Sequence, residues 1–170
     1  HNLAIVTAEN GDVSVVYLPD QHAADTFSLP GPPVQVGDNR AGTRLFVLLE
    51  GEEDVIVVDT EQLAITDRIP LAGIDAATAR MVPSPDGTTL YVLDTATPRI
   101  IAIDLGTKQV TQELRLSNQP LDLTISADGE LLSVAATTDD GGALTTYNRS
   151  LQPIDTVELP APPSRIVSPR

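Results

Sequence analysis

The stretch Ser84–Val110 reads SPDGTTLYVLDTATPRIIAIDLGTKQV, and its alternation of turns and apolar runs recurs along the chain. The segment Ser84–Gly87 has the composition of a tight turn, because proline presets φ, aspartate can bond to its own backbone and glycine tolerates positive φ. Two apolar runs follow, Leu90–Leu93 and Arg99–Asp104, with a polar loop between them. This order predicts neighbouring antiparallel strands.

Similar phrases recur about every 42 residues. Four copies can be laid in register at Leu3, Leu45, Leu90 and Leu131, which are 42, 45 and 41 residues apart. A period of this size is typical of propellers and solenoids. Each copy predicts four short strands, except the first, which predicts three, and no segment shows a helical pattern. The sequence therefore predicts an all-β propeller of about four four-stranded antiparallel blades.

We expect one domain over residues 1–170, with blades at approximately 1–29, 34–71, 79–116 and 121–159. Residues 164–168 match the start of the third copy and are predicted to be the first strand of a further or closing blade, the strand that the first blade lacks. The ring could close on itself by strand exchange, pair with a second copy, or continue on another polypeptide. We expect association with more blades, because an open array would expose a terminal face.

The third copy resembles the YVTN-type β-propeller repeat of surface-layer and lactonase-like proteins. The shared elements are the Asp86-Gly87 turn, the Tyr91-Val92 strand, the run Ile100–Asp104, and then Thr107 and Val110. This resemblance implies a part of a seven- or eight-bladed ring. It implies little about activity, because such propellers serve as enzymes, dehydrogenase subunits, surface-layer modules and binding proteins.

Composition excludes several classes of function. Asp and Glu number 24 against 10 Lys and Arg, and the formal net charge of −14 argues against a nucleic-acid partner. The absence of Cys excludes disulfides, thiolate zinc sites and a cysteine nucleophile. No apolar run is long enough to predict a membrane-spanning segment. No nucleophile elbow, P-loop or dinucleotide fingerprint is present, and no catalytic residue is predicted.

Acidic residues gather in the loops between the second and third strands of the copies, which share one face in a propeller. We expect this face to contact a ligand or partner; the alternative is that its charges are simply solvated loop residues. The residues concerned are Glu9, Glu50, Glu52, Glu53, Asp54, Asp94, Asp139 and Asp140. Its carboxylates could also hold Ca²⁺, although no recognised calcium-loop spacing occurs and no other cofactor is expected. Aspartates that recur at one blade position are predicted to form turns instead, as in the pairs Asp86 with Asp128 and Asp59 with Asp104.

We expect an extracytoplasmic binding or scaffold module that mediates protein–protein association, with a protein partner or a second copy completing the propeller. The location rests on the family resemblance and on a first residue, His1, that is not Met. The alternative is part of a propeller enzyme or oxidoreductase subunit, of lactonase-like or amine-dehydrogenase-like type. An enzyme would bring His, Glu or Arg side chains from several blades to one channel mouth.

Overall fold

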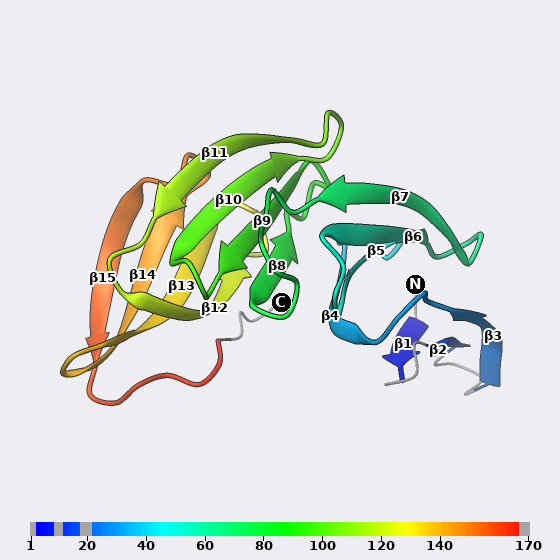
Figure 1. Cartoon of the computed structure of the whole chain (residues 1–170), viewed down its shortest axis with the longest axis horizontal. Coiled ribbons are helices and arrows are strands. Elements are labelled where there is room, and N and C mark those ends of the chain that lie inside the picture. The colour runs from blue at the N-terminus through cyan, green and yellow to red at the C-terminus, as the bar shows by residue number, and fades with distance from the viewer. Residues whose placement is uncertain (1–2, 9–11, 18–21, 167–170) are drawn as a thin grey trace. The chain divides into compact units, whose positions relative to one another are not determined.

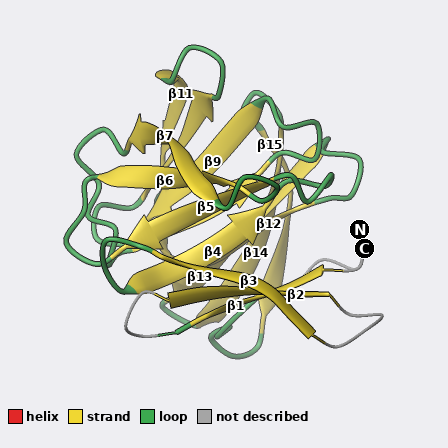
Figure 2. Cartoon of the chain, turned by 90° about the vertical axis from the view of Figure 1, so that its right-hand side faces the viewer, coloured by secondary structure: helices red, strands yellow, loops and turns green. Residues whose placement is uncertain are grey.

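The computed structural model describes residues 3–8, 12–17 and 22–166 (Figure 1). These residues form fifteen β-strands and contain no helix (Figure 2). The chain divides into two compact units, residues 1–77 and residues 78–170. Each unit holds two antiparallel sheets, and each sheet corresponds to one copy of the repeat.

The N-terminal unit contains blades one and two. Blade one is a three-stranded sheet, in the order β1 (Leu3–Thr7), β2 (Asp12–Tyr17) and β3 (His22–Ser28). Blade two has four strands, in the order β4 (Pro33–Asp38), β5 (Arg44–Leu49), β6 (Asp54–Asp59) and β7 (Ala64–Pro70). The predicted strand numbers of three and four are confirmed.

The C-terminal unit contains blades three and four, drawn in Figure 1 as two facing sheets. Blade three has the order β8 (Ala79–Pro83), β9 (Thr89–Asp94), β10 (Arg99–Asp104) and β11 (Gln109–Arg115). Blade four has the order β12 (Gln119–Ile125), β13 (Leu131–Thr138), β14 (Gly141–Asn148) and β15 (Pro153–Leu159). Both blades have the four strands that the sequence predicts.

Burial differs between the middle and the outer strands of a blade. The four central side chains of β6 and of β10 are all buried, whereas most of β7, β11 and β15 is exposed. A strand buried on both faces favours a continuous apolar run, which is why the sequence reads Val55-Ile-Val-Val and Ile100-Ile-Ala-Ile at these places.

The described residues of each unit include an apolar core shared by its two sheets. In the N-terminal unit, Val13 of β2 and Leu29, which follows β3, pack with buried residues of β5 and β6. In the C-terminal unit, blades three and four share a core built from Tyr91, Leu93, Ile100, Ala102, Leu123, Leu132, Val134, Tyr147 and Leu151. The two sheets of each unit are therefore held together mainly by aliphatic side chains, joined in the C-terminal unit by Tyr91 and Tyr147.

Recurring aspartates form the turns, as the sequence predicts. Asp86 Oδ1 accepts hydrogen bonds from Ser84 Oγ (2.6 Å) and from the backbone N–H of Thr88 (3.1 Å). Asp128 accepts the equivalent bond from Ser126 Oγ (2.5 Å). These hydrogen bonds, with that from the serine as the main cause, lower the pKa of both carboxyl groups.

The outer hairpins use a second recurring turn. Asp59 Oδ1 accepts from the backbone N–H groups of Glu61 (2.9 Å) and Gln62 (2.8 Å). Asp104 Oδ1 likewise accepts from the backbone N–H groups of Gly106 (3.1 Å) and Thr107 (2.7 Å). The hydrogen bond from the Thr107 N–H is the main cause of the lowered pKa of Asp104. Their repetition therefore serves backbone geometry.

The turns also correct the register of the repeats. The backbone N–H of Thr89 donates to Ser84 Oγ (2.9 Å), and that of Leu131 donates to Ser126 Oγ (3.0 Å). Leu131 therefore corresponds to Thr89 and not to Leu90, so the predicted register at Leu131 is one residue out. The physical reason is that a run of two leucines offers two alignments, and a one-residue slip exchanges the faces of a strand.

Strand pairing gives the same correction for the first copy. Leu3 lies opposite Tyr17, which in turn lies opposite His22, five residues later. In blade two the residue equivalent to Leu3 is Arg44. It lies opposite Asp59, which lies opposite Ala64, again five residues later. In the corrected register the copies begin at Leu3, Arg44, Thr89 and Leu131.

The C-terminal segment crosses blade four after β15. A Cβ on Gly142 of β14 would lie 3.0 Å from the carbonyl oxygen of Ala161 and would contact the ring of Pro163. Further along, the backbone N–H of Ile166 donates to Asp122 Oδ2 of β12 (3.1 Å). Residues 161–166 contain no strand, and the strand predicted at 164–168 stays a prediction because its last two residues lie outside the described ones.

Candidate binding site

The acidic residues predicted to form one face play different parts. Glu9 lies outside the described residues. Four others belong to the β5–β6 loop and the start of β6: Glu50, Glu52, Glu53 and Asp54. Of these, Glu52 pairs with Arg68 of β7, with 3.3 Å between Oε2 and Nη1. Among the described residues, no group of three or more His, Asp or Glu side chains is arranged to hold a metal ion, so the predicted Ca²⁺ site has no ligand cluster there.

Asp94 supports the fold of its own loop. It is buried at the end of β9, and its Oδ1 accepts from the backbone N–H groups of Ala96 and Thr97, both at 3.0 Å. Its Oδ2 lies 3.4 Å from Nε of Arg99, whose guanidinium also pairs with Glu113 (3.3 Å). A carboxylate held from three sides is poorly placed to contact a partner, and its role is to close the β9–β10 turn.

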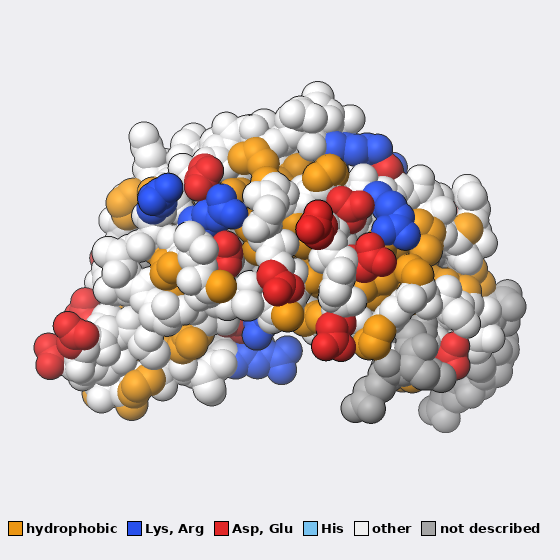
Figure 3. Space-filling model, in the orientation of Figure 1, with side chains coloured by type: hydrophobic (Ala, Val, Ile, Leu, Met, Phe, Trp, Pro, Cys, Tyr) orange, Lys and Arg blue, Asp and Glu red, His pale blue; other side chains and the backbone are white. Residues whose placement is uncertain are grey.

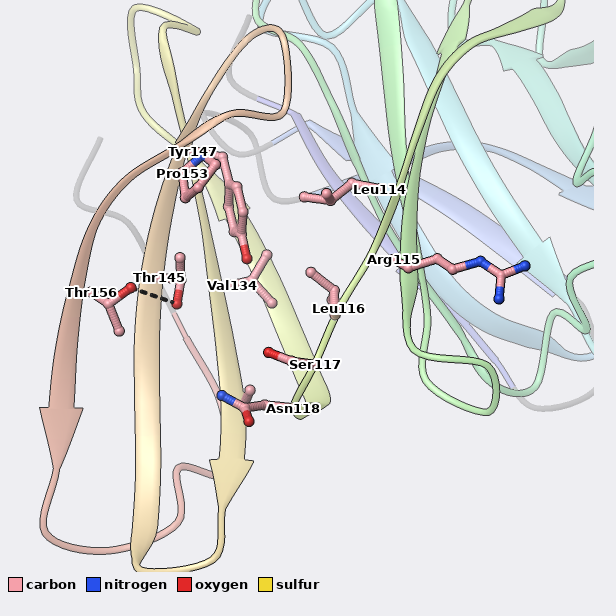
Figure 4. Close-up of a pocket in the computed structure, with 11 residues that line it drawn as sticks. Leu114, Arg115, Leu116, Ser117, Asn118, Val134, Thr145, Tyr147, Pro153 and Thr156 are labelled. Atoms are coloured by element: carbon pink, nitrogen blue, oxygen red, sulfur yellow. Dashed lines mark hydrogen bonds between the residues drawn. The ribbon is translucent and has the colours of Figure 1, made fainter.

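An apolar groove opens between blades three and four, on the side of their outer strands (Figure 4). Its volume is about 310 Å³, and its apolar lining comes from Leu114, Leu116, Val134, Ala136, Tyr147 and Pro153. The inner strand β12 contacts β8 and β9, whereas the groove separates β11 from β15. The two sheets thus meet at their inner strands and leave this space between their outer ones.

Polar groups line the groove beside this apolar floor. Thr145 and Thr156 face each other across β14 and β15, with their hydroxyl oxygens 3.1 Å apart. Tyr147 is 8% exposed, and burial raises the pKa of its phenol. Figure 4 shows the side chain of Arg115 pointing away from Tyr147. Charged groups are therefore kept out of the middle of the groove.

A second hollow, of about 770 Å³, adjoins the groove. Ser117 and Asn118, which follow β11, line both. Apart from Leu159, the remainder of its lining is polar or acidic and consists of Gln119, Thr137, Thr138, Asp139, Asp140 and Glu158. Figure 3 shows carboxylates gathered over the turn between β13 and β14. We call this hollow, with Asp139, Asp140 and Glu158, the acidic hollow.

The acidic hollow joins two predicted residues to one that was missed. Asp139 and Asp140 form the β13–β14 turn, as expected for a loop between second and third strands. Glu158 belongs to the fourth strand, β15, and lies opposite Ala143. Only the pairing of β14 with β15 brings Glu158 to that end of the blade. The sole signal for it in the sequence is its position near the end of the fourth predicted strand.

No family model matches the chain, and no curated protein matches it. Among solved structures, 1267 chains match, and a fold so widely shared does not specify an activity. One match is hydrazine synthase of Kuenenia stuttgartiensis, with a TM-score of 0.74 and 20% sequence identity, over 91% of this chain and 45% of that one.

The likeness shows a β-propeller fold. It agrees with the antiparallel four-stranded sheets and with the all-β prediction, and at 20% identity it extends to the fold alone. The chain spans less than half the length of the hydrazine synthase chain. Within the part of the chain that the structure describes, no helix has the length and apolar character needed to cross a bilayer.

Proposed function

We propose that the chain is a protein-binding module built from YVTN-type propeller blades, and that it acts outside the cytoplasm. The observation that carries the binding proposal is the apolar groove of the C-terminal unit, with Leu114, Leu116 and Tyr147 in its lining. A concave surface with apolar side chains on its floor and polar groups at its edge is typical of a binding site. The hydroxyl and amide groups at its edge supply hydrogen bonds that orient a bound segment.

The same groove gives little support to the enzyme alternative. Its lining contains no His, Asp, Glu, Lys or Cys, so its hydroxyl groups have no neighbouring general base among the lining residues. The phenol of Tyr147 is neutral near pH 7, as for any tyrosine, and burial raises its pKa further. Acid–base and nucleophilic catalysis both need a titratable partner within hydrogen-bond distance of the reacting group.

A larger propeller is part of this proposal. The likeness to the hydrazine synthase chain covers 91% of this chain but only 45% of that longer chain. We infer that a protein partner or a second copy supplies further blades beside the four seen here. A mass measurement in solution tests this: a complex of two or more chains supports the inference, and a chain that is monomeric at all concentrations contradicts it.

The binding proposal is tested by selecting random 12-residue segments on the whole immobilised chain and measuring the affinity of each selected segment by fluorescence anisotropy. Thr156→Arg places a long charged side chain in the groove from an exposed position, so we expect it to weaken binding at least about tenfold. Thr66→Arg is the matched control, because Thr66 is an exposed threonine of the outer strand β7. Failure to select any segment, or equal affinity for both variants, would overturn the proposal.

A further inference from the structure

The groove and the acidic hollow form one continuous surface along the edge of blades three and four. Ser117 and Asn118 line both spaces, directly after the last apolar residue of the groove on that side, Leu116. A ligand that follows β11 through the groove therefore passes from apolar side chains to carboxylates. The lining of this one path thus changes from apolar in the groove to acidic in the hollow.

The shape of this path suits an extended polypeptide. β11 and β15 flank the groove, and each is the outermost strand of its sheet. The outer side of an edge strand presents backbone N–H and C=O groups that can pair with an added extended segment. Side chains of such a segment alternate in direction, so one can enter the groove while its neighbours face the rim.

Charge selects the kind of segment. Asp139, Asp140 and Glu158 line the acidic hollow, and neither Lys nor Arg is among its lining residues. The net charge of −14 adds a negative field around the whole chain. Such a surface attracts cationic groups and repels anionic ones, which raises specificity and the rate of association more than affinity.

We propose that this surface binds an extended segment of a partner protein in which an apolar side chain is followed by lysine or arginine residues. The apolar side chain packs in the groove against Leu114, Leu116 and Tyr147. The basic side chains reach the acidic hollow and lie near Asp139, Asp140 and Glu158. This inference rests on the proposed function, which it extends by naming the chemistry of the partner segment.

The test uses a segment that the groove selects, resynthesised with two lysines, two glutamines or two glutamates after its apolar residue. On the whole chain we expect the lysine form to bind about five- to tenfold more tightly than the glutamine form, and the glutamate form to bind more weakly than both. The advantage of lysine should shrink between 50 and 300 mM salt, because exposed charges are screened.

Two variants of equal charge separate the hollow from the general field. Asp139→Asn with Asp140→Asn should remove most of the lysine advantage and leave the affinity of the glutamine form unchanged. The matched control is Asp38→Asn with Glu61→Gln, two exposed acidic residues of the N-terminal unit, and it should keep the lysine advantage.

Each contrary result has a distinct meaning. Equal affinity of the lysine and glutamine forms, or equal losses in the two double variants, overturns the inference and leaves the proposed function standing, since the groove still binds. Competition by spermidine that displaces the glutamine form as well as the lysine form also overturns it, because the site would then be a general cation site. Loss of all binding, including that of the glutamine form, counts against the proposed function itself.

Discussion

Arg149 in the β14–β15 turn forms an ion pair with Asp86 in the turn before β9, 63 residues earlier in the chain. The same guanidinium lies 3.8 Å from Glu130. Beside this pair, a Cβ on Gly129 would lie 3.0 Å from Pro85 Cδ, so the turns of blades three and four touch. The third and fourth copies of the repeat are thus joined at their turns as well as through their apolar core.

Arg149→Met should cost about 1 kcal/mol or less of the free energy of unfolding, because both partners are 42% exposed and water screens the pair. Asp86→Ala should cost more, about 1 to 2 kcal/mol, since it also leaves the Ser84 and Thr88 donors of the turn without their acceptor. Urea unfolding at pH 7 measures both. An Arg149 variant that is less stable than the Asp86 variant would contradict this order.

Acid should remove the contribution of Asp86. Its pKa in the folded chain lies well below the value of about 3.9 expected when unfolded, chiefly because Ser84 donates a hydrogen bond to it. Between these two values the unfolded chain binds more protons, so stability falls as the pH decreases below about 4. We expect wild-type chain to lose more stability than Asp86→Asn between pH 6 and pH 2.5, and parallel curves would contradict this.

Asp94→Ala should destabilise the chain by about 2 to 4 kcal/mol, because two backbone N–H groups and a largely buried Arg99 lose their acceptor. Asp94→Asn keeps an acceptor oxygen for the turn and should cost less. Thermal unfolding followed by circular dichroism provides the comparison. If Asp94→Ala leaves stability unchanged but weakens binding of a selected segment, Asp94 belongs to the binding surface after all.

Two isoleucines allow a matched test of the shared core of blades three and four. Ile100 is fully buried, and Ile100→Ala should cost about 2 to 5 kcal/mol because it leaves a cavity among packed side chains. Ile154 is 57% exposed, and Ile154→Ala should change stability by about 0.5 kcal/mol at most. Equal costs in urea unfolding would show that β10 does not lie in a packed interior.

Gly142→Ala should disturb the C-terminal segment where it crosses β14. The added methyl group would meet Pro163 and the carbonyl oxygens of Ala161 and Ala136, so we expect a loss of about 1 to 3 kcal/mol and faster hydrogen exchange at Ile166. Gly31→Ala is the control, because a Cβ there meets nothing within 4 Å. Unchanged exchange at Ile166 in the Gly142 variant would contradict the crossing.

The strands were predictable because their signals are local. The strand Arg99–Asp104 has in the structure the bounds that the sequence predicts, since turn residues enclose a short apolar run there. The turn roles of Asp86 and Asp104 were also predictable, because an aspartate bonds to backbone within a few residues of itself. The register at Leu131 was predicted one residue out because it was set from the leucines. The turn serines Ser84 and Ser126, which are 42 residues apart, place Leu131 at the position of Thr89.

The candidate site was predictable only in part. Asp139 and Asp140 were expected from their loop, and the structure confirms that they lie in the turn between β13 and β14. The groove was not expected, because Leu114 and Tyr147 are 33 residues apart and each reads as an ordinary strand residue. Asp94 was assigned to the acidic face, because the sequence does not reveal that Arg99 and two backbone amides hold it.

The repeat in the sequence was sufficient to determine that this chain forms antiparallel blades, because strand propensity, turn chemistry and alternating burial act over a few residues at a time. The tertiary structure decided which faces meet, where the groove opens, and which carboxylates share a hollow. These properties depend on distances between residues of different strands and blades. A one-residue change of register leaves the local pattern nearly intact but exchanges the faces of a strand.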